Sequence, residues 1–231
     1  MLRVGLTGGL GSGKSTVAAY LRELGAEVSE SDEMGRAMME PEQPAFREIV
    51  RVFGPEVVRA DGKLDRARLA EMAFRGGRLD ELNGIVHPAV IEAQRQWMNE
   101  VFRRDPAAVA IAVSALIFEV ERDARARGEK EGVLADWRRR IDRVVVVSAP
   151  DEVKIARYVD RLVAGGARRD GAEADARLRL AHQIPDEVKA AKADYVLENS
   201  GDLAGLRAQT ARLWERLKAE SNKAAQNESL K

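Results

Sequence analysis

Residues 7–16, TGGLGSGKST, constrain the possible folds more than any other stretch of this chain. Gly8 to Ser15 match the pattern G-x-x-x-x-G-K-[ST] at every required position. The mostly apolar run Arg3 to Leu6 comes before it and predicts a buried strand. Lys14 to Leu24 follows with apolar residues at helical spacing. A strand, a glycine loop and a helix in this order are typical of the start of a doubly wound α/β sheet.

The composition of this loop suits the binding of a phosphate chain. Glycines let successive backbone N–H groups turn toward one anion, and the following helix presents its own free N–H groups there. We expect Lys14 to reach the β- and γ-phosphates of ATP and to act in catalysis, Ser15 to hold Mg²⁺ carried with ATP, and Thr16 to bind the α-phosphate. The predicted ATP-binding residues of the loop are Gly9, Leu10, Gly11, Ser12, Gly13, Lys14, Ser15 and Thr16. A chance match of a glycine-rich turn would not explain the flanking strand and helix.

Further apolar runs predict the rest of an α/β fold, a mostly parallel five-stranded sheet flanked by helices. They cover residues 26–29, 108–118, 143–148 and 195–197. Unbroken β-branched runs such as RVVVVS at 143–148 are typical of strands that are buried on both faces. From Gly35 to about Arg104, between the runs 26–29 and 108–118, the pattern is helical, with a bend or break expected near Pro88.

These patterns divide the chain into four parts. Residues 1–34, 105–150 and 194–218 are expected to form a nucleotide-binding core, and 35–104 a helical insertion that covers a substrate. Residues 151–193 are expected to form a small lid with a hinge at Gly165 and Gly166, and 219–231 a flexible tail. The highly charged stretch 119–140 predicts an exposed helix and loop.

The charge balance and the cysteine count limit the partners and the compartment. Lys+Arg and Asp+Glu are equal at 38, and no basic patch alternates with aromatic residues, so nucleic acid is not an expected partner. No stretch approaches the roughly 18 apolar residues of a membrane span, and no signal pattern opens the chain. The absence of cysteine fits a reducing compartment. We expect a cytoplasmic protein that is a monomer or a weak homo-oligomer.

Three classes of protein share such a loop, and the sequence favours one of them. A regulatory GTPase needs N-K-x-D after a late strand, but residues 148–151 read SAPD. A remodelling ATPase needs an acidic residue at a strand end, for which Glu119 could serve. The short chain, the helical insertion and the arginine-rich segment 151–179 favour a small kinase.

Outside the loop, three groups of residues are candidates for chemistry. Asp32 follows the second predicted strand and is the best general-base candidate, although an aspartate there could simply cap the next helix. Arg157 and Arg161 share a helix face and could offset phosphate charge, or could belong to a solvated charged face. His87 and His182 have no second ligand at metal spacing, so no metal site built by the protein alone is expected.

Several stretches in the same order make the chain resemble the dephospho-CoA kinase family. They are TGGLGSGKST at 7–16, SDEMGR at 31–36, FG at 53–54, LNGIVHP at 82–88, ALIFE at 115–119, RVVVVSAP at 143–150 and ADYVLENSGD at 193–202. The resemblance covers about residues 1–215. It implies a P-loop kinase core, a helical CoA-binding domain and a lid. It also implies ATP-dependent phosphorylation of the 3′-hydroxyl of dephospho-CoA to give coenzyme A.

The resemblance also implies roles for individual residues. Asp32 falls on the acceptor-side carboxylate, Arg36 on the arginine that meets the dephospho-CoA phosphates, and His87 on a histidine near the acceptor pocket. The other implied positions are Leu116 and Glu119 toward the substrate, Arg157 and Arg161 as lid arginines, and Asn199 beside the adenine of ATP.

The chain departs from the family pattern at several places. Glu30 stands where the family has aspartate, Ala115 replaces a proline, the segment 120–140 is longer, and the lid stretch VAGGARRDGAEAD differs. None of these changes removes a group that the chemistry needs. Two alternatives stay open, namely another small-molecule or nucleoside monophosphate kinase, and a nucleotide-binding regulatory protein without catalysis.

Overall fold

The computed structural model describes residues 1–229, which form two compact units. The first comprises residues 1–28 and the described residues from 98 onward, and the second comprises residues 29–97. The second unit thus begins and ends about six residues before the helical insertion expected at 35–104. Each unit is described by itself.

The sheet has five strands in the order β2-β3-β1-β4-β5. The strands are β1 (Leu2–Thr7), β2 (Glu27–Glu30), β3 (Val109–Val113), β4 (Arg143–Ser148) and β5 (Tyr195–Glu198). β1 pairs in parallel with β3, placing Val4 beside Ile111, and with β4, placing Leu6 beside Val145. β4 also pairs in parallel with β5. The predicted parallel α/β fold with five strands is confirmed.

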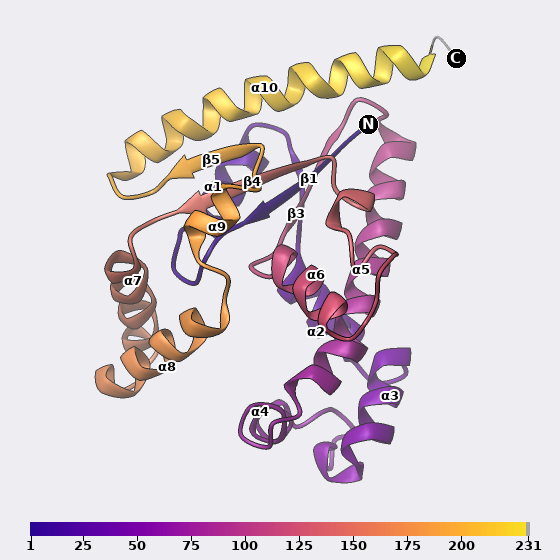
Figure 1. The fold of residues 1–231 in the computed structure, drawn as a ribbon, viewed down its shortest axis with the longest axis vertical. Helices are drawn as coiled ribbons and strands as arrows, with labels where there is room; N and C mark the ends of the chain where they lie inside the picture. The colour runs from indigo at the N-terminus through magenta and orange to yellow at the C-terminus, as the bar shows by residue number, and fades with distance from the viewer. Residues whose placement is uncertain (230–231) are drawn as a thin grey trace. The chain divides into compact units, whose positions relative to one another are not determined.

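Alternation along β4 explains how helices cover both faces of the sheet. Val145 and Val147 pack in one apolar cluster with α1 (Lys14–Glu23) and α10 (Leu203–Ser229), whereas Val144 and Val146 pack in another. The second cluster includes residues of α6 (Ile117–Ala126) and of the short helix η2 (Trp137–Arg139). Successive strand residues point to opposite faces, so a strand covered on both sides is apolar throughout. Figure 1 shows α10 and α6 on opposite sides of β4.

Three predictions for this unit are corrected by the structure: the end of one strand, the exposure of one stretch and the conformation of the C-terminal segment. The apolar run at 108–118 is a strand only to Val113, because the chain turns at 114–116 and α6 then begins. The stretch 119–140 is only partly exposed, since Trp137 is buried and meets the Phe118 ring edge-on at 5.7 Å between centroids. The segment expected to be a flexible tail is helical through residue 229. Within this helix, Ser221 Oγ donates to the carbonyls of Ala107 and Ala108 at 2.9 Å. Residues 230 and 231 of that tail lie outside the described part.

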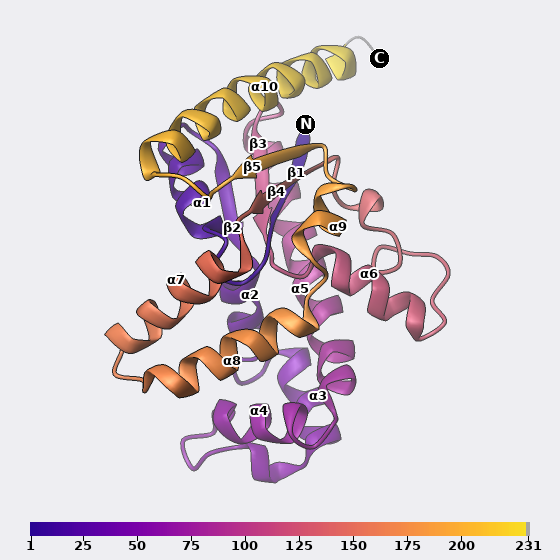
Figure 2. The ribbon, with the colours of Figure 1, turned by 60° about the vertical axis from the view of Figure 1, so that its left-hand side comes forward.

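The segment predicted to be a lid consists of a helical hairpin and one short helix. The hairpin is formed by α7 (Asp151–Ala164) and α8 (Arg169–His182), which lie side by side in Figures 1 and 2 and are joined by a turn at Gly165 and Gly166. Gly166 has φ +93°, a conformation that favours glycine. α9 (Asp186–Ala190) then leads to β5.

The second unit is helical and has its own apolar core. It contains α2 (Ser31–Met38), α3 (Pro44–Phe53), the short helix η1 (Pro55–Val57), α4 (Arg66–Phe74) and most of α5 (Leu79–Arg104). Ile49, Phe53 and Leu69 lie at the centre of the core, and the Arg78 guanidinium stacks 4.4 Å from the Phe53 ring centroid. α5 continues through Pro88, so the break expected there is absent.

Candidate nucleotide and acceptor site

The glycine loop adopts the backbone that its sequence predicts. Gly11 and Gly13 have φ of +70° and +100°, in the left-handed region where a side chain is strained. A Cβ on Gly11 would lie 2.2 Å from the Lys154 carbonyl oxygen, and one on Gly13 would lie 2.1 Å from Asn199 Nδ2. Gly11 and Gly13 are therefore required by the backbone conformation of the loop and by the packing of neighbouring elements.

The start of α1 provides polar groups suited to a phosphate chain. Gly13 is the N-cap and supplies no side-chain hydrogen bond, so the first N–H groups of α1 have no capping side chain. Lys14 Nζ donates to the carbonyls of Gly8 at 3.0 Å and Gly9 at 2.8 Å, which holds its charge over the loop. Ser15 is exposed in the first turn, and Thr16 is half-buried beside it. The predicted loop residues are thus gathered around one helix N-terminus.

Asn199 connects the loop to the base of the helical hairpin. Its Nδ2 donates to the Ser12 carbonyl at 2.7 Å, while its own carbonyl accepts from Arg157 at 3.0 Å. Arg161, one turn further along α7, instead lies over the Tyr158 ring at 5.3 Å. The structure therefore brings Arg157 and Asn199 to the loop but turns Arg161 toward the hairpin.

Sequence reasoning missed two side chains that contact the loop directly, and the lysine that pairs with one of them. Asp186 Oδ1 accepts from the Gly9 N–H at 3.0 Å, and Gln183 Oε1 accepts from the Leu10 N–H at 3.0 Å. Lys154 Nζ lies 2.9 Å from Asp186 Oδ2 and 2.7 Å from Asp151 Oδ1. Burial opposes the charge of Lys154, but hydrogen bonds to these two carboxylates raise its pKa. No local pattern marks the contacts of Asp186 and Gln183, because their partners lie far away in the chain.

Glu119, predicted to contact the substrate, has a different environment in the structure. Its carboxylate is 2 % exposed, lies 2.7 Å from Lys189 Nζ and accepts from the Ile184 N–H at 2.9 Å. Lys189 also donates to the Ala115 carbonyl at 3.0 Å. Glu119 in the first turn of α6 thus forms an internal ion pair through one oxygen, and its contact with the substrate stays a prediction. Leu116, just before α6, is half-buried.

In the helical unit, the candidate acceptor-side residues lie on α2. Asp32 is in the first turn and is exposed, and its side chain forms no hydrogen bond or ion pair with the residues from 1 to 229. The N-cap of α2 is Glu30, so Asp32 does not have the capping role considered as an alternative. Arg36 lies one turn further on and is also exposed, which puts a cation and a carboxylate on one side of the helix. His87 is half-buried on α5.

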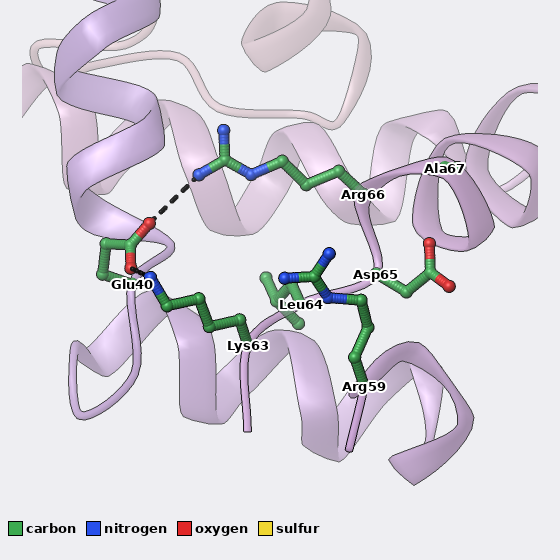
Figure 3. Close-up of a pocket in the computed structure, with 7 residues that line it drawn as sticks. All are labelled: Glu40, Arg59, Lys63, Leu64, Asp65, Arg66 and Ala67. Atoms are coloured by element: carbon green, nitrogen blue, oxygen red, sulfur yellow. Dashed lines mark hydrogen bonds and ion pairs between the residues drawn. The ribbon is translucent and has the colours of Figure 1, made fainter. Parts of the chain in front are cut away.

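A pocket of about 420 Å³ lies in the same unit, and its lining mixes basic with acidic and apolar residues: Arg59, Lys63, Arg66, Glu40, Asp65, Leu64 and Ala67 (Figure 3). Arg66 donates to Glu40 at 3.2 Å and to the Arg36 carbonyl at 3.4 Å, and Lys63 lies 3.7 Å from Glu40. Arg59 lines the pocket but pairs with Asp61 at 2.6 Å. The pocket is therefore next to the C-terminal half of α2, whose Arg36 carbonyl accepts from the pocket residue Arg66.

Residues 1–229 contain neither a cluster of metal ligands nor a helix that could span a membrane. No group of three or more His, Cys, Asp or Glu side chains in this range is arranged to hold a metal ion. None of the helices in the same range combines the length and the apolarity that a bilayer crossing requires.

Comparison with known proteins identifies relatives over nearly the whole chain. The family model described as dephospho-CoA kinase matches residues 2–129 and 131–205. The dephospho-CoA kinase of Corynebacterium glutamicum is 37 % identical, with 92 % of this chain and 96 % of that protein covered. The dephospho-CoA kinase of Anaeromyxobacter dehalogenans is 41 % identical, over 91 % and 89 % of the two chains.

Solved structures agree with this relationship. The crystal structure of TT1252 from Thermus thermophilus is 34 % identical and covers 93 % of this chain and 97 % of its own, with a TM-score of 0.67. Dephospho-CoA kinase from Campylobacter jejuni has a TM-score of 0.56 over 93 % and 96 % of the two chains. At 19 % identity, the second structure supports the fold alone.

Proposed function

Because the chain belongs to the dephospho-CoA kinase family, we propose that it transfers the γ-phosphoryl group of ATP to the ribose 3′-hydroxyl of dephospho-CoA. The products are coenzyme A and ADP. The observation that carries the proposal is the complete phosphate loop at 8–15, opening an uncapped helix, within a match that extends from residue 2 to 205. We expect the reaction in the cytoplasm.

In this reaction the loop binds and orients ATP. The N–H groups of Gly11, Gly13 and the first turn of α1 donate to the phosphates, since those of Gly9 and Leu10 already donate to Asp186 and Gln183. Lys14 moves from the loop carbonyls to the terminal phosphates. Asn199 holds the Ser12 carbonyl and thereby fixes the loop beside the nucleoside. Arg157 and Arg161 on the hairpin would stabilise negative charge on the transferred group, the latter after leaving Tyr158.

The acceptor side of the mechanism assigns one carboxylate and one cation. The oxygen of the 3′-hydroxyl bonds to the γ-phosphorus, and the bond from that phosphorus to the ADP oxygen breaks. Asp32 accepts the proton that the 3′-hydroxyl loses in this step. Its exposure and its lack of a partner in residues 1–229 leave the carboxylate available for this role. Arg36 binds acceptor phosphate, and His87 and Leu116 contact the acceptor.

The residues present also fit Mg²⁺ that arrives with ATP. Mg²⁺ prefers oxygen ligands and keeps phosphate and water in its shell, so one hydroxyl from the protein is sufficient. Ser15 offers such an oxygen, exposed and directly after Lys14. When bound, the ion neutralises charge on the β- and γ-phosphates.

A panel of acceptors tests the proposed substrate. ADP formation is measured with dephospho-CoA, nucleoside monophosphates, shikimate and gluconate, each with the wild-type protein and with Lys14→Met as the background control. The proposal predicts turnover with dephospho-CoA alone. Turnover with another acceptor would instead support a different small-molecule kinase, and nucleotide binding without turnover would support a regulatory protein.

The variant Asp32→Asn tests the proposed base. A positioned base contributes about 10²–10⁴-fold, so kcat should fall by that factor while KM for ATP stays near its wild-type value. A kcat within about threefold of wild type would remove Asp32 from the mechanism.

A further inference from the structure

A buried ion pair connects the helical hairpin to the first half of the phosphate loop. Lys154 on α7 and Asp186 at the start of α9 are 3 % and 4 % exposed, and their charged atoms are 2.9 Å apart. The second carboxylate oxygen of Asp186 accepts from the Gly9 N–H at 3.0 Å. The pair therefore contacts the loop through both of its members, since the Lys154 carbonyl also lies against Gly11.

We propose that Lys154 and Asp186 are positioning residues for ATP: Asp186 fixes the Gly9 end of the loop, and Lys154 cancels the charge of that carboxylate beside the phosphates. The proposal goes beyond the family assignment and rests on the proposed function only for its turnover readout. Nucleotide binding tests it independently of any acceptor.

Stability alone is a weak explanation for this pair. Removing two charges from water costs several kcal/mol, and an apolar pair of similar volume is often at least as stable. The geometry supplies something that an apolar pair could not, namely an acceptor for a loop N–H group. Gln183 gives the neighbouring Leu10 N–H the same kind of acceptor without a charge, at 3.0 Å. The charged acceptor, unlike the neutral one, needs a cation beside it.

The need for that cation follows from the ligand. A carboxylate hydrogen-bonded to a loop that binds ATP repels the triphosphate, and a buried site screens this repulsion poorly. Lys154 removes most of the repulsion, and Asp151, which is largely exposed, completes its hydrogen bonds at 2.7 Å. The two halves of the pair should therefore have opposite effects on nucleotide affinity.

Four variants separate these effects, with the Kd of ATP and of ADP measured by isothermal titration calorimetry. Lys154→Met leaves the carboxylate uncompensated and should raise the Kd for ATP at least about tenfold, with a smaller rise for ADP. Asp186→Asn in the same chain should recover most of the loss, because its amide oxygen still accepts from Gly9. Asp186→Asn alone should bind ATP within about threefold of wild type, whereas Asp186→Ala should bind more weakly than Asp186→Asn.

Asp175→Ala is the matched control. Asp175 lies in the same hairpin, where it accepts from the Tyr158 hydroxyl at 2.5 Å and from Arg179 at 2.8 Å, without a contact to the loop. It should lower the melting temperature but leave the Kd for ATP unchanged. Steady-state kinetics should show the Lys154→Met defect in KM for ATP, with KM for dephospho-CoA near wild type.

Two results would overturn the proposal. One is an ATP Kd for Lys154→Met equal to that of wild type, and the other is a double variant that binds ATP no better than Lys154→Met. If Lys154→Met does not fold, the comparison of Asp186→Ala with Asp186→Asn decides, and equal affinities refute the positioning role. A protein that binds ATP as expected but does not phosphorylate dephospho-CoA would refute the proposed function and leave this inference standing.

Discussion

Lys189→Met is the most demanding test of the internal packing behind the site. Lys189 is fully buried, forms an ion pair with Glu119 and donates to the Ala115 carbonyl. Glu119 in turn accepts from the Ile184 N–H. Removing one partner of a buried pair leaves an uncompensated charge, which costs about 3–5 kcal/mol. For a chain of this size each kcal/mol lowers the melting temperature by about 2–4 °C, so we expect a fall of about 6–20 °C.

The assay is urea unfolding at neutral pH together with calorimetry, with Lys192→Met as the matched control. Lys192 is exposed and only lies over the Phe118 ring at 5.7 Å, so its loss should cost at most about 1 kcal/mol. Glu119→Gln combined with Lys189→Met should recover much of the stability, since the Gln oxygen can still accept from Ile184. A single Lys189→Met variant within about 1 kcal/mol of wild type would refute the reasoning, as would a double variant no more stable than it.

Three further predictions concern the loop and the sheet. Lys14→Met should lower kcat by about 10²–10³-fold in a coupled ADP assay while the melting temperature stays unchanged, and a kcat near wild type would contradict its role. Gly13→Ala should weaken ATP binding measured by calorimetry, because its φ is +100° and the new Cβ would meet Asn199 Nδ2 at 2.1 Å; wild-type affinity would show that the loop adapts. Burial acts to raise the pKa of Asp142, but hydrogen bonds from the Arg3 side chain and N–H lower it below its usual value. The pair therefore stabilises the fold above about pH 4 and loses this effect as the pH falls through the folded-state pKa, so the melting temperatures of wild type and Asp142→Asn should converge below about pH 4.

The parts of the fold that follow from local sequence were predictable. The loop at 8–15 and the strand RVVVVS at 143–148 carry their signals within a few neighbouring residues, and the structure has both. The exposed Asp32 and Arg36 were also accessible from sequence, because each lies in a short motif directly after β2.

The remaining features depend on contacts between distant parts of the chain. Lys154 and Asp186 are 32 residues apart, and Glu119 accepts from an N–H group 65 residues away. In sequence these residues are indistinguishable from the other charges of a chain that is 33 % charged. The helix at 219–229 was missed for the same reason, since its polar sequence gives no sign that Ser221 is buried against the carbonyls of Ala107 and Ala108.

The position of the transferred phosphoryl group on the product decides whether the chain phosphorylates the 3′-hydroxyl of dephospho-CoA. The wild-type protein is incubated with ATP, Mg²⁺ and dephospho-CoA, and the product is examined by phosphorus–proton correlation NMR. We expect a new phosphomonoester coupled to the ribose 3′ proton, formed in a one-to-one ratio with ADP. A phosphorylated product at any other position, or ADP formed without a phosphorylated acceptor, would contradict this expectation.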